Sequence, residues 1–219
     1  MRLLLVRHGQ TPANVTGLLD AEVPGPGLTD LGQEQADALP AALGDRGIER
    51  LFTSTMVRTQ ITAAPLARAL DLEPVVLPGL REIEAGELQG KRDTVSVQSY
   101  LAVAYAWAAG DLDERMPGAE DGHAFFGRYD DAVRRIEETG AEVAAAFSHG
   151  AAIRIWAAVT AQNVPNDLGR NRRHLENTGV VELEGSTTDG WRLVDWAGEP
   201  TGGDDLADLS AQDPTGERF

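Results

Sequence analysis

Two histidine-glycine steps carry the residue types in this sequence that are best suited to chemistry. Arg7-His8-Gly9 follows the aliphatic run Leu3 to Val6, and Ser148-His149-Gly150 follows the run from Glu142. A neutral imidazole nitrogen can attack phosphorus, and a neighbouring guanidinium can hold two phosphate oxygens at once. These residues therefore indicate phosphoryl transfer, although either motif alone also fits a buried histidine with no catalytic role.

Both motifs stand where a buried strand is expected to end. An aliphatic run without polar alternation predicts a strand that is covered on both faces, as in the middle of a parallel sheet. Ligands of such sheets bind beyond the carboxyl ends of the strands. Neighbouring parallel strands would bring the two imidazoles together, and the helix expected after His149 would offer backbone N–H groups to an anion.

Arg58 adds a cation at a third junction of the same kind. It lies shortly after the expected strand 48–53 and near the start of an expected helix. On an isolated helix such an arginine would be a solvated surface residue. Together with the two histidine motifs, it suggests a positively charged site on one rim of the sheet.

The elements that must position these residues alternate between strand and helix. Capping residues and apolar periodicity predict helices at 30–43, 56–70, 95–109, 121–139 and 150–160. Strands are expected at 3–6, 48–53, 74–76, 142–148, 179–184 and 191–196. This order predicts an α/β three-layer sandwich with a mostly parallel central sheet and a helical cap insertion at about 91–120.

Composition limits the range of functions. A chain of 219 residues with 42% hydrophobic residues fits one main domain, which we place at 1–197. The net charge of -16 disfavours nucleic acid binding, and the absence of cysteine excludes thiolate chemistry and disulfides. No apolar run is long enough for a membrane span, so a cytoplasmic protein is expected. Residues 198–219 are poor in large apolar side chains and predict a flexible acidic C-terminal tail.

Several motifs together resemble the histidine phosphatase superfamily, also called the phosphoglycerate mutase-like superfamily. The resemblance runs from Met1 to about Glu184, and agreement among several motifs is stronger evidence than any one of them. It rests on Arg7-His8-Gly9-Gln10-Thr11 with Asn14, Ser54 with Arg58 and Thr59, Glu82 with Gly86 and Gly90, and Ser148-His149-Gly150.

The resemblance implies a role for each residue. His8 would be phosphorylated in a covalent intermediate, and Glu82 would protonate the leaving oxygen and then activate water. The phosphoryl group would be bound by residues that supply cations, polar donors or backbone N–H groups: Arg7, Thr11, Asn14, Arg58, His149 and Gly150. Such a site needs no metal or cofactor, because these groups stabilise the charge. Glu82 also has a simpler interpretation, as part of a solvated acidic stretch.

The same superfamily contains phosphatases and mutases. Mutases of this kind hold a substrate carboxylate with an arginine pair in the insertion, whereas Arg115 is the only cation between Thr94 and Glu120. This favours a phosphatase acting on a small-molecule phosphate monoester, with a mutase-type phosphotransferase or a non-catalytic phosphate-binding module as alternatives. Tyr100, Tyr105 and Trp107 could line a pocket or pack in the core.

The remaining predictions concern partners and less informative residues. No membrane partner is expected, and a homodimer is a candidate assembly. His123 is expected on the surface, and the basic stretch 171–174 could line the pocket mouth or form a solvated turn. A dinucleotide-binding site is excluded because the first strand is not followed by a Gly-x-Gly-x-x-Gly turn.

Overall fold

A six-stranded mixed sheet forms the centre of the molecule. The computed structural model describes residues 1–164 and 174–216. The strands, in spatial order, are β3-β2-β4-β1-β5-β6. Strands β1 to β4 are mutually parallel, whereas β5 and β6 are antiparallel to their neighbours, which confirms the expected mostly parallel sheet. Their bounds are Arg2–Arg7 (β1), Arg50–Thr53 (β2), Val75–Val76 (β3), Val143–Ser148 (β4), Val180–Ser186 (β5) and Gly190–Ala197 (β6).

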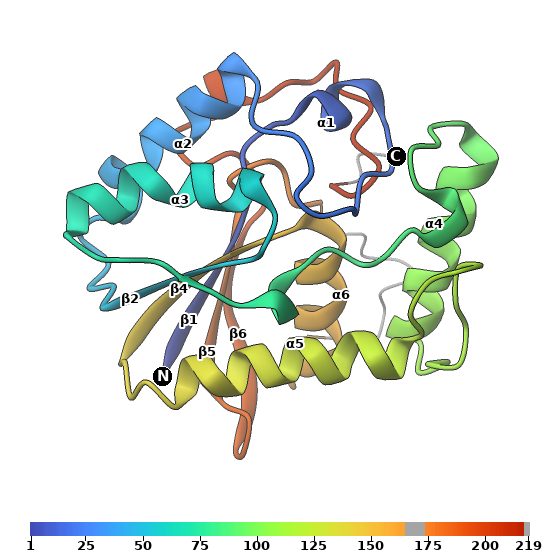
Figure 1. The fold of residues 1–219 in the computed structure, drawn as a ribbon. Coiled ribbons are helices and arrows are strands. Elements are labelled where there is room, and N and C mark those ends of the chain that lie inside the picture. The colour runs from blue at the N-terminus through green and yellow to red at the C-terminus, as the bar shows by residue number, and fades with distance from the viewer. Residues whose placement is uncertain (165–173, 217–219) are drawn as a thin grey trace.

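Helices cover both faces of this sheet (Figure 1). Helices α2 (Asp30–Leu43) and α3 (Val57–Leu70) lie on one side, and α5 (Gly122–Glu137) and α6 (Gly150–Thr160) on the other. The shorter elements are α1 (Pro12–Thr16) and three 3₁₀ turns, Pro78–Leu80 (η1), Gly86–Leu88 (η2) and Asp204–Leu206 (η3). The three-layer sandwich is therefore confirmed.

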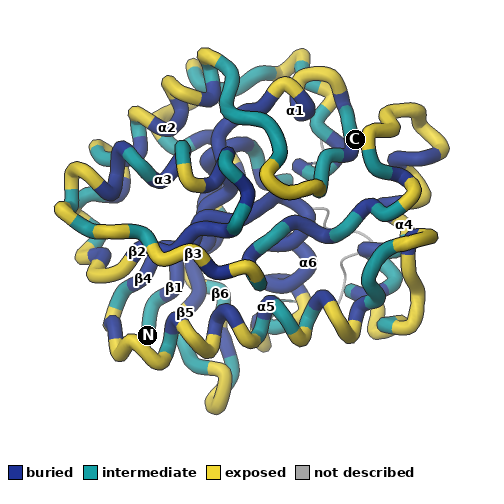
Figure 2. Tube along the Cα trace, viewed as in Figure 1, coloured by how far each residue is buried: buried dark blue, intermediate teal, exposed yellow. Residues whose placement is uncertain are grey.

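Alternate side chains of β1 supply two separate cores. Leu4 and Val6 pack with residues of α2 and α3, whereas Leu3 and Leu5 belong to the core beneath α5 and α6. All four side chains are fully buried, and the strands form the dark centre of Figure 2. This two-sided burial explains why β1 has no polar alternation.

Side-chain caps fix where the helices begin. Thr29 accepts from the backbone N–H of Gly32 at the start of α2, and Asp121 accepts from that of Ala124 at the start of α5. Asp93 caps α4 (Thr94–Ala108) through Ser96. Each cap satisfies a backbone donor that the helix itself leaves unpaired, so these starts fall within a residue or two of their predicted positions.

The insertion contains α4, which packs against α6 at one side of the sheet (Figure 1). Trp107 is fully buried and stacks on Phe125 with ring centroids 5.5 Å apart. Tyr100 is also buried and donates to the backbone oxygen of Ile83 over 3.1 Å. Core packing is therefore the correct interpretation for Tyr100 and Trp107, while Tyr105 lines a surface cavity of about 590 Å³.

The acidic segment, residues 198–216, was expected to be a flexible tail, but the structure shows it in contact with the domain. It runs back along the domain, and Asp213 and Asp208 bond to residues at the carboxyl end of β1. The prediction rested on the small number of large apolar side chains in this segment. The segment contacts the domain through polar groups, which such a count does not include. Residues 217–219 of the predicted tail lie outside the described residues. Among the described helices, none combines the length and apolar character that crossing a bilayer requires.

Candidate active site

The two histidine motifs meet at the carboxyl ends of adjacent strands. β1 and β4 pair in parallel with Arg7 opposite Ser148, so His8 and His149 follow at the same rim. Their ring centroids lie 5.2 Å apart, and both side chains are almost fully buried. The structure thus brings together the imidazoles that the sequence placed far apart.

His8 is held with one nitrogen available for attack. Its Nδ1 lies 2.8 Å from the backbone oxygen of Gly9. A carbonyl oxygen only accepts, so Nδ1 carries the proton and Nε2 keeps its lone pair. Burial lowers the pKa of His8 well below its usual value, and the nearby charges of Arg58 and Arg7 lower it further. His8 is therefore a neutral imidazole at neutral pH.

His149 is fixed on both sides of its ring. Arg58 Nε lies 3.3 Å from its Nδ1, and Ser54 Oγ lies 2.8 Å from its Nε2. The guanidinium only donates, so Nδ1 accepts and Nε2–H donates to Ser54. Burial and then the charge of Arg58 lower the pKa of His149 well below its usual value. Both histidines are thus neutral, in defined tautomers.

Arg58 is oriented by the loop that follows α1. Its Nη1 lies 3.2 Å from Asp20 Oδ2, and its Nη2 donates to the backbone oxygen of Asp20 over 2.9 Å. The side chain is only 3% exposed. Asp20 therefore holds a buried guanidinium beside His149, and the earlier alternative of a solvated surface arginine is wrong.

Glu82 lies at the N-terminus of α6 and not in a solvated stretch. Its Oε1 accepts from the backbone N–H groups of Ile83 and Ala152, and its Oε2 from that of Ala151. These helix amides bind the carboxylate of Glu82, whereas the sequence had suggested them for phosphate. Burial nevertheless raises the pKa of Glu82 above its usual value against these hydrogen bonds, as a proton donor requires.

Arg128 on α5 clamps the loop that carries Glu82. Its guanidinium donates to the backbone oxygens of Gly79, Arg81 and Glu82 over 2.8 to 2.9 Å. The same group pairs with Glu120, whose side chain is 9% exposed. A single cation thus satisfies three carbonyl groups next to Glu82, and it fixes where that carboxyl group lies.

Arg7 reaches the site beside the first turn of α6. Its side chain is fully buried, and its Nη1 donates to the backbone oxygen of Leu175 over 2.7 Å. A Cβ atom at Gly150 would lie 2.9 Å from Arg7 Nε, so glycine is needed there for the close approach. Among the described residues, Arg7 Nε has no hydrogen-bond partner, and this donor is available to a ligand.

Asn14 and Thr11 form one hydrogen-bonded unit. Asn14 Oδ1 accepts from the hydroxyl and the backbone N–H of Thr11, each over 2.9 Å, and from Asn177. The Asn14 amide nitrogen donates to Asp213 Oδ1 over 3.0 Å. The hydroxyl of Thr11 donates within this unit, to Asn14 Oδ1.

Several site residues were missed by the sequence analysis. Asp20, Arg128, Asn177 and Asp213 each contact a predicted site residue. Asp213 forms an ion pair with Arg7 at 2.5 Å. None of these residues stands at a strand end or in a motif, so no local pattern could have identified them.

Other residues singled out in the sequence lie away from this cluster. His123 is exposed beside Asp113, as expected of a surface histidine, and Arg115 pairs with Asp121. His174 pairs with Glu199, and the rest of the basic stretch, residues 171–173, lies outside the described residues. In the described part of the chain, His174, Glu176 and Glu199 are the group that could hold a metal, with ligand atoms within 4.8 Å. His8 and His149 are not part of it.

Comparison with known proteins agrees with this geometry. The family model of the histidine phosphatase superfamily (branch 1) matches residues 3–198. The PE-PGRS family protein PE_PGRS11 of Mycobacterium tuberculosis is 38% identical over 213 residues, which cover 90% of this chain but 36% of that protein. The adenosylcobalamin/alpha-ribazole phosphatase of Escherichia coli is 31% identical over 139 residues, covering 63% of this chain and 68% of that enzyme.

A solved structure shows the same fold. The mycobacterial glucosyl-3-phosphoglycerate phosphatase, determined with VO3, superposes with a TM-score of 0.74 at 25% identity, covering 90% of this chain and 99% of that one. The chain spans about a third of the length of the PE-PGRS relative, as the 36% coverage shows. The match to the family model nevertheless takes in nearly the whole sandwich and every motif residue from Arg7 to Gly150. This chain belongs to the histidine phosphatase superfamily.

Proposed function

We propose that this chain is a metal-independent phosphatase that hydrolyses a small-molecule phosphate monoester through a phosphohistidine on His8. The observation that carries the proposal is the fixed tautomer of His8, whose Nδ1–H bonds to Gly9. The remaining nitrogen, Nε2, then has a lone pair to attack phosphorus. Superfamily membership and the phosphatase names of the relatives support the same reaction.

In the first step, His8 Nε2 forms a bond to phosphorus as the bond to the leaving oxygen breaks. The transferred group carries its negative charge on its other oxygens, and fixed donors stabilise that charge. Arg7 and Arg58 supply guanidinium groups, and Asn14 supplies an amide N–H. Arg7 Nε is a buried donor without a partner in the described residues, and a phosphoryl oxygen would satisfy it. His149 lines the same space, 5.2 Å from His8.

Glu82 is the proposed proton donor in this step and the base in the next. An alkoxide leaves poorly, so a protonated carboxyl group donates its proton to the departing oxygen. The resulting carboxylate then accepts a proton from water as that water attacks phosphorus and releases His8. Burial keeps the pKa of Glu82 raised, which favours the acid form needed first.

Hydrolysis is favoured over phosphoryl return to a second substrate. The insertion offers one cation between Thr94 and Glu120, and this Arg115 pairs with Asp121 with its side chain 58% exposed. No arginine pair is therefore present in this fully described segment to hold a substrate carboxylate. Beside the cap helix lies the 590 Å³ cavity, whose wall includes Val97, Leu101 and Tyr105. Arg92, Thr94 and Gln98 line the same cavity, so a leaving group with an apolar and a polar part fits this wall.

Turnover of p-nitrophenyl phosphate in the presence of EDTA tests the proposal. A phosphatase releases inorganic phosphate and nitrophenol in equal amounts, with or without EDTA. A mutase supplied with phosphoglycerates returns the phosphoryl group to an acceptor and releases little phosphate. A binding module turns over neither substrate. Full inhibition by EDTA, or absence of phosphate release from any monoester tried, would contradict the proposed function.

A further inference from the structure

The acidic segment ends against the residues proposed to bind phosphate. Its ribbon passes α2 and runs beside α1 (Figure 1). Asp213 Oδ2 pairs with Arg7 Nη1 at 2.5 Å, and Asp213 Oδ1 accepts from the amide of Asn14 over 3.0 Å. Thr215 adds its hydroxyl oxygen, which accepts from Arg7 Nη2 over 3.1 Å. The segment thus uses a carboxylate to contact both groups.

The state of Asp213 suits this role. Burial alone would raise the pKa of Asp213, but the charge of Arg7 and hydrogen bonds from Arg7 and Asn14 outweigh it and lower the pKa below the usual value. The carboxylate is therefore ionised at neutral pH. An ionised carboxylate offers a guanidinium the same oxygen pair as one edge of a phosphate group.

The carboxylate is nevertheless an incomplete replacement for phosphate. Arg7 Nε is buried and has no hydrogen-bond partner in the part of the chain that the structure describes. Arg58 pairs with Asp20 and His149, and no contact between Arg58 and Asp213 is found. A phosphate ester brings more oxygens and a larger negative charge, so it can satisfy donors that Asp213 leaves unused.

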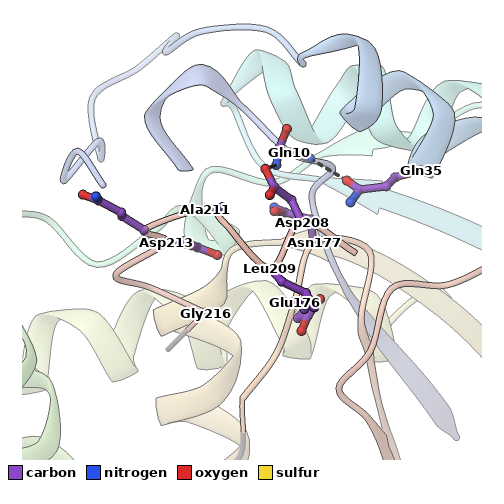
Figure 3. Close-up of a pocket in the computed structure, with 10 residues that line it drawn as sticks. Gln10, Gln35, Glu176, Asn177, Asp208, Leu209, Ala211, Asp213 and Gly216 are labelled. Atoms are coloured by element: carbon purple, nitrogen blue, oxygen red, sulfur yellow. Dashed lines mark hydrogen bonds between the residues drawn. The ribbon is translucent and has the colours of Figure 1, made fainter. Parts of the chain in front are cut away.

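The contacts that hold the segment down are mostly polar. Its largest apolar side chain beyond η3, Leu209, is 76% exposed. A cavity of about 130 Å³, enough for several water molecules, remains between the segment and the body of the domain (Figure 3). Gln10 and Asn177 line it from the domain, and Asp208 and Asp213 line it from the segment. Water can replace the polar contacts, whereas Pro214 is buried next to Asp213 and would be uncovered when the segment is released.

We propose that Asp213 is an intramolecular competitor that occupies the phosphate subsite, and that the acidic segment must swing away before substrate binds. This inference rests on the proposed function, because it takes Arg7 and Asn14 as phosphate ligands. Gln212 lines both the 130 Å³ cavity and the 590 Å³ cavity beside the cap helix. Release of the segment therefore removes a wall that these two cavities share.

The first test replaces Asp213→Asn and measures binding of inorganic phosphate by calorimetry, together with KM and kcat for p-nitrophenyl phosphate. The isosteric amide loses the charge attraction to Arg7. If the binding-competent state is populated to about a tenth in the parent protein, phosphate affinity rises and KM falls by about tenfold. Asp205→Asn is the matched control, because it removes the same charge from an exposed position of the same segment. Its phosphate affinity should equal that of the parent.

The second test tethers the segment. A Cβ atom at Gly17 would lie 3.0 Å from Gln212 Cβ, and the chain contains no cysteine. The double variant Gly17→Cys, Gln212→Cys can therefore form one disulfide, at the cost of backbone strain because Gly17 has a φ of 72°. The oxidised protein should bind phosphate at least about tenfold more weakly than the same protein after reduction. Gln212→Cys alone should show no response to reductant.

The outcomes separate this inference from the proposed function. Unchanged or weaker phosphate binding by Asp213→Asn, or equal binding by the tethered and reduced forms, would overturn the inference while turnover by the parent protein still supports a phosphatase. Calorimetry reports phosphate binding even in a protein that turns nothing over. If Asp213→Asn binds phosphate more tightly but neither protein hydrolyses any ester, Asp213 is a competitor of phosphate and the proposed phosphatase function is contradicted.

Discussion

The imidazole rings of His8 and His149 lie with their centroids 5.2 Å apart and inclined by 58°. Neither ring carries a charge, because burial and the neighbouring guanidinium groups lower both pKa values. The positive charge of the site therefore comes from Arg7 and Arg58, while His8 keeps a lone pair on Nε2. This division of roles leads to the following predictions.

Replacing Glu82→Gln should separate substrates by their leaving groups. Hydrolysis of an alkyl phosphate should slow by about 10² to 10⁴, since an alkoxide needs a proton in order to leave. Hydrolysis of p-nitrophenyl phosphate should fall far less, because the phenolate is a good leaving group. Measuring kcat/KM for both esters checks this, and equal losses would instead assign Glu82 a structural role.

The ratio of alkyl to aryl turnover should fall as pH rises. In the proposed mechanism the proton donor is the acid form of Glu82, whose pKa is raised from its usual value by burial. This form is present below that pKa and is lost as pH rises through it, which affects only the ester that needs the proton. The phosphate of an alkyl ester has a higher second pKa than that of p-nitrophenyl phosphate, so each kcat/KM is first referred to the concentration of the substrate dianion. A ratio of kcat/KM values that does not change with pH would contradict the assignment.

At low pH, the dependence of kcat/KM on pH reports the protonation of His8. Its pKa is lowered below 6.5 by burial and by Arg58 and Arg7, so His8 stays neutral until the pH falls below that value. The aryl ester does not need the proton of Glu82, so its kcat/KM for the substrate dianion should be retained down to pH 6.5 and lost at lower pH. A decline for the aryl ester that begins well above pH 6.5 would contradict the lowered pKa of His8.

Arg128→Gln should damage both stability and the proton-donor step. It removes the clamp on the backbone of residues 79–82 and leaves Glu120 buried without its partner, which costs on the order of 3 kcal/mol of unfolding free energy. The double variant Arg128→Gln, Glu120→Gln removes the unpaired charge. It should recover much of that stability but not the rate on alkyl phosphates.

Chemical denaturation and the alkyl-to-aryl rate ratio measure the two effects of Arg128 separately. Arg134→Gln on the same helix is the control, because the Arg134–Asp131 pair is exposed. It should change neither quantity. If the double variant regains the parent's rate ratio together with its stability, Arg128 has only a structural role and does not position Glu82.

Much of the fold follows from local signals in the sequence. The uninterrupted aliphatic runs of β1 and β4 report burial on both faces, and Thr29, Asp93 and Asp121 mark helix starts through their side-chain caps. The convergence of His8, Arg58 and His149 follows from a general property of parallel sheets, whose carboxyl ends share one rim.

The rest of the site depends on contacts that leave no local pattern. Arg128 fixes Glu82 from a different helix, and Asp20 orients Arg58 from a loop, each through bonds between residues far apart in the chain. Asp213 stands among many acidic residues of similar appearance, and its ion pair with Arg7 distinguishes it only in three dimensions. Polar contacts between distant residues leave no periodic pattern in the sequence from which they could be predicted.

The most direct test of the central claim is to identify the phosphorylated residue. The protein is mixed with an excess of p-nitrophenyl phosphate, quenched at high pH, where phosphohistidine survives, and digested for mass spectrometry. A phosphoryl group on His8 that disappears in acid, together with loss of both the adduct and turnover in His8→Ala with an unchanged fold, is the predicted result. Substantial turnover by His8→Ala, or phosphate found on another residue while His8 stays unmodified, would contradict the account.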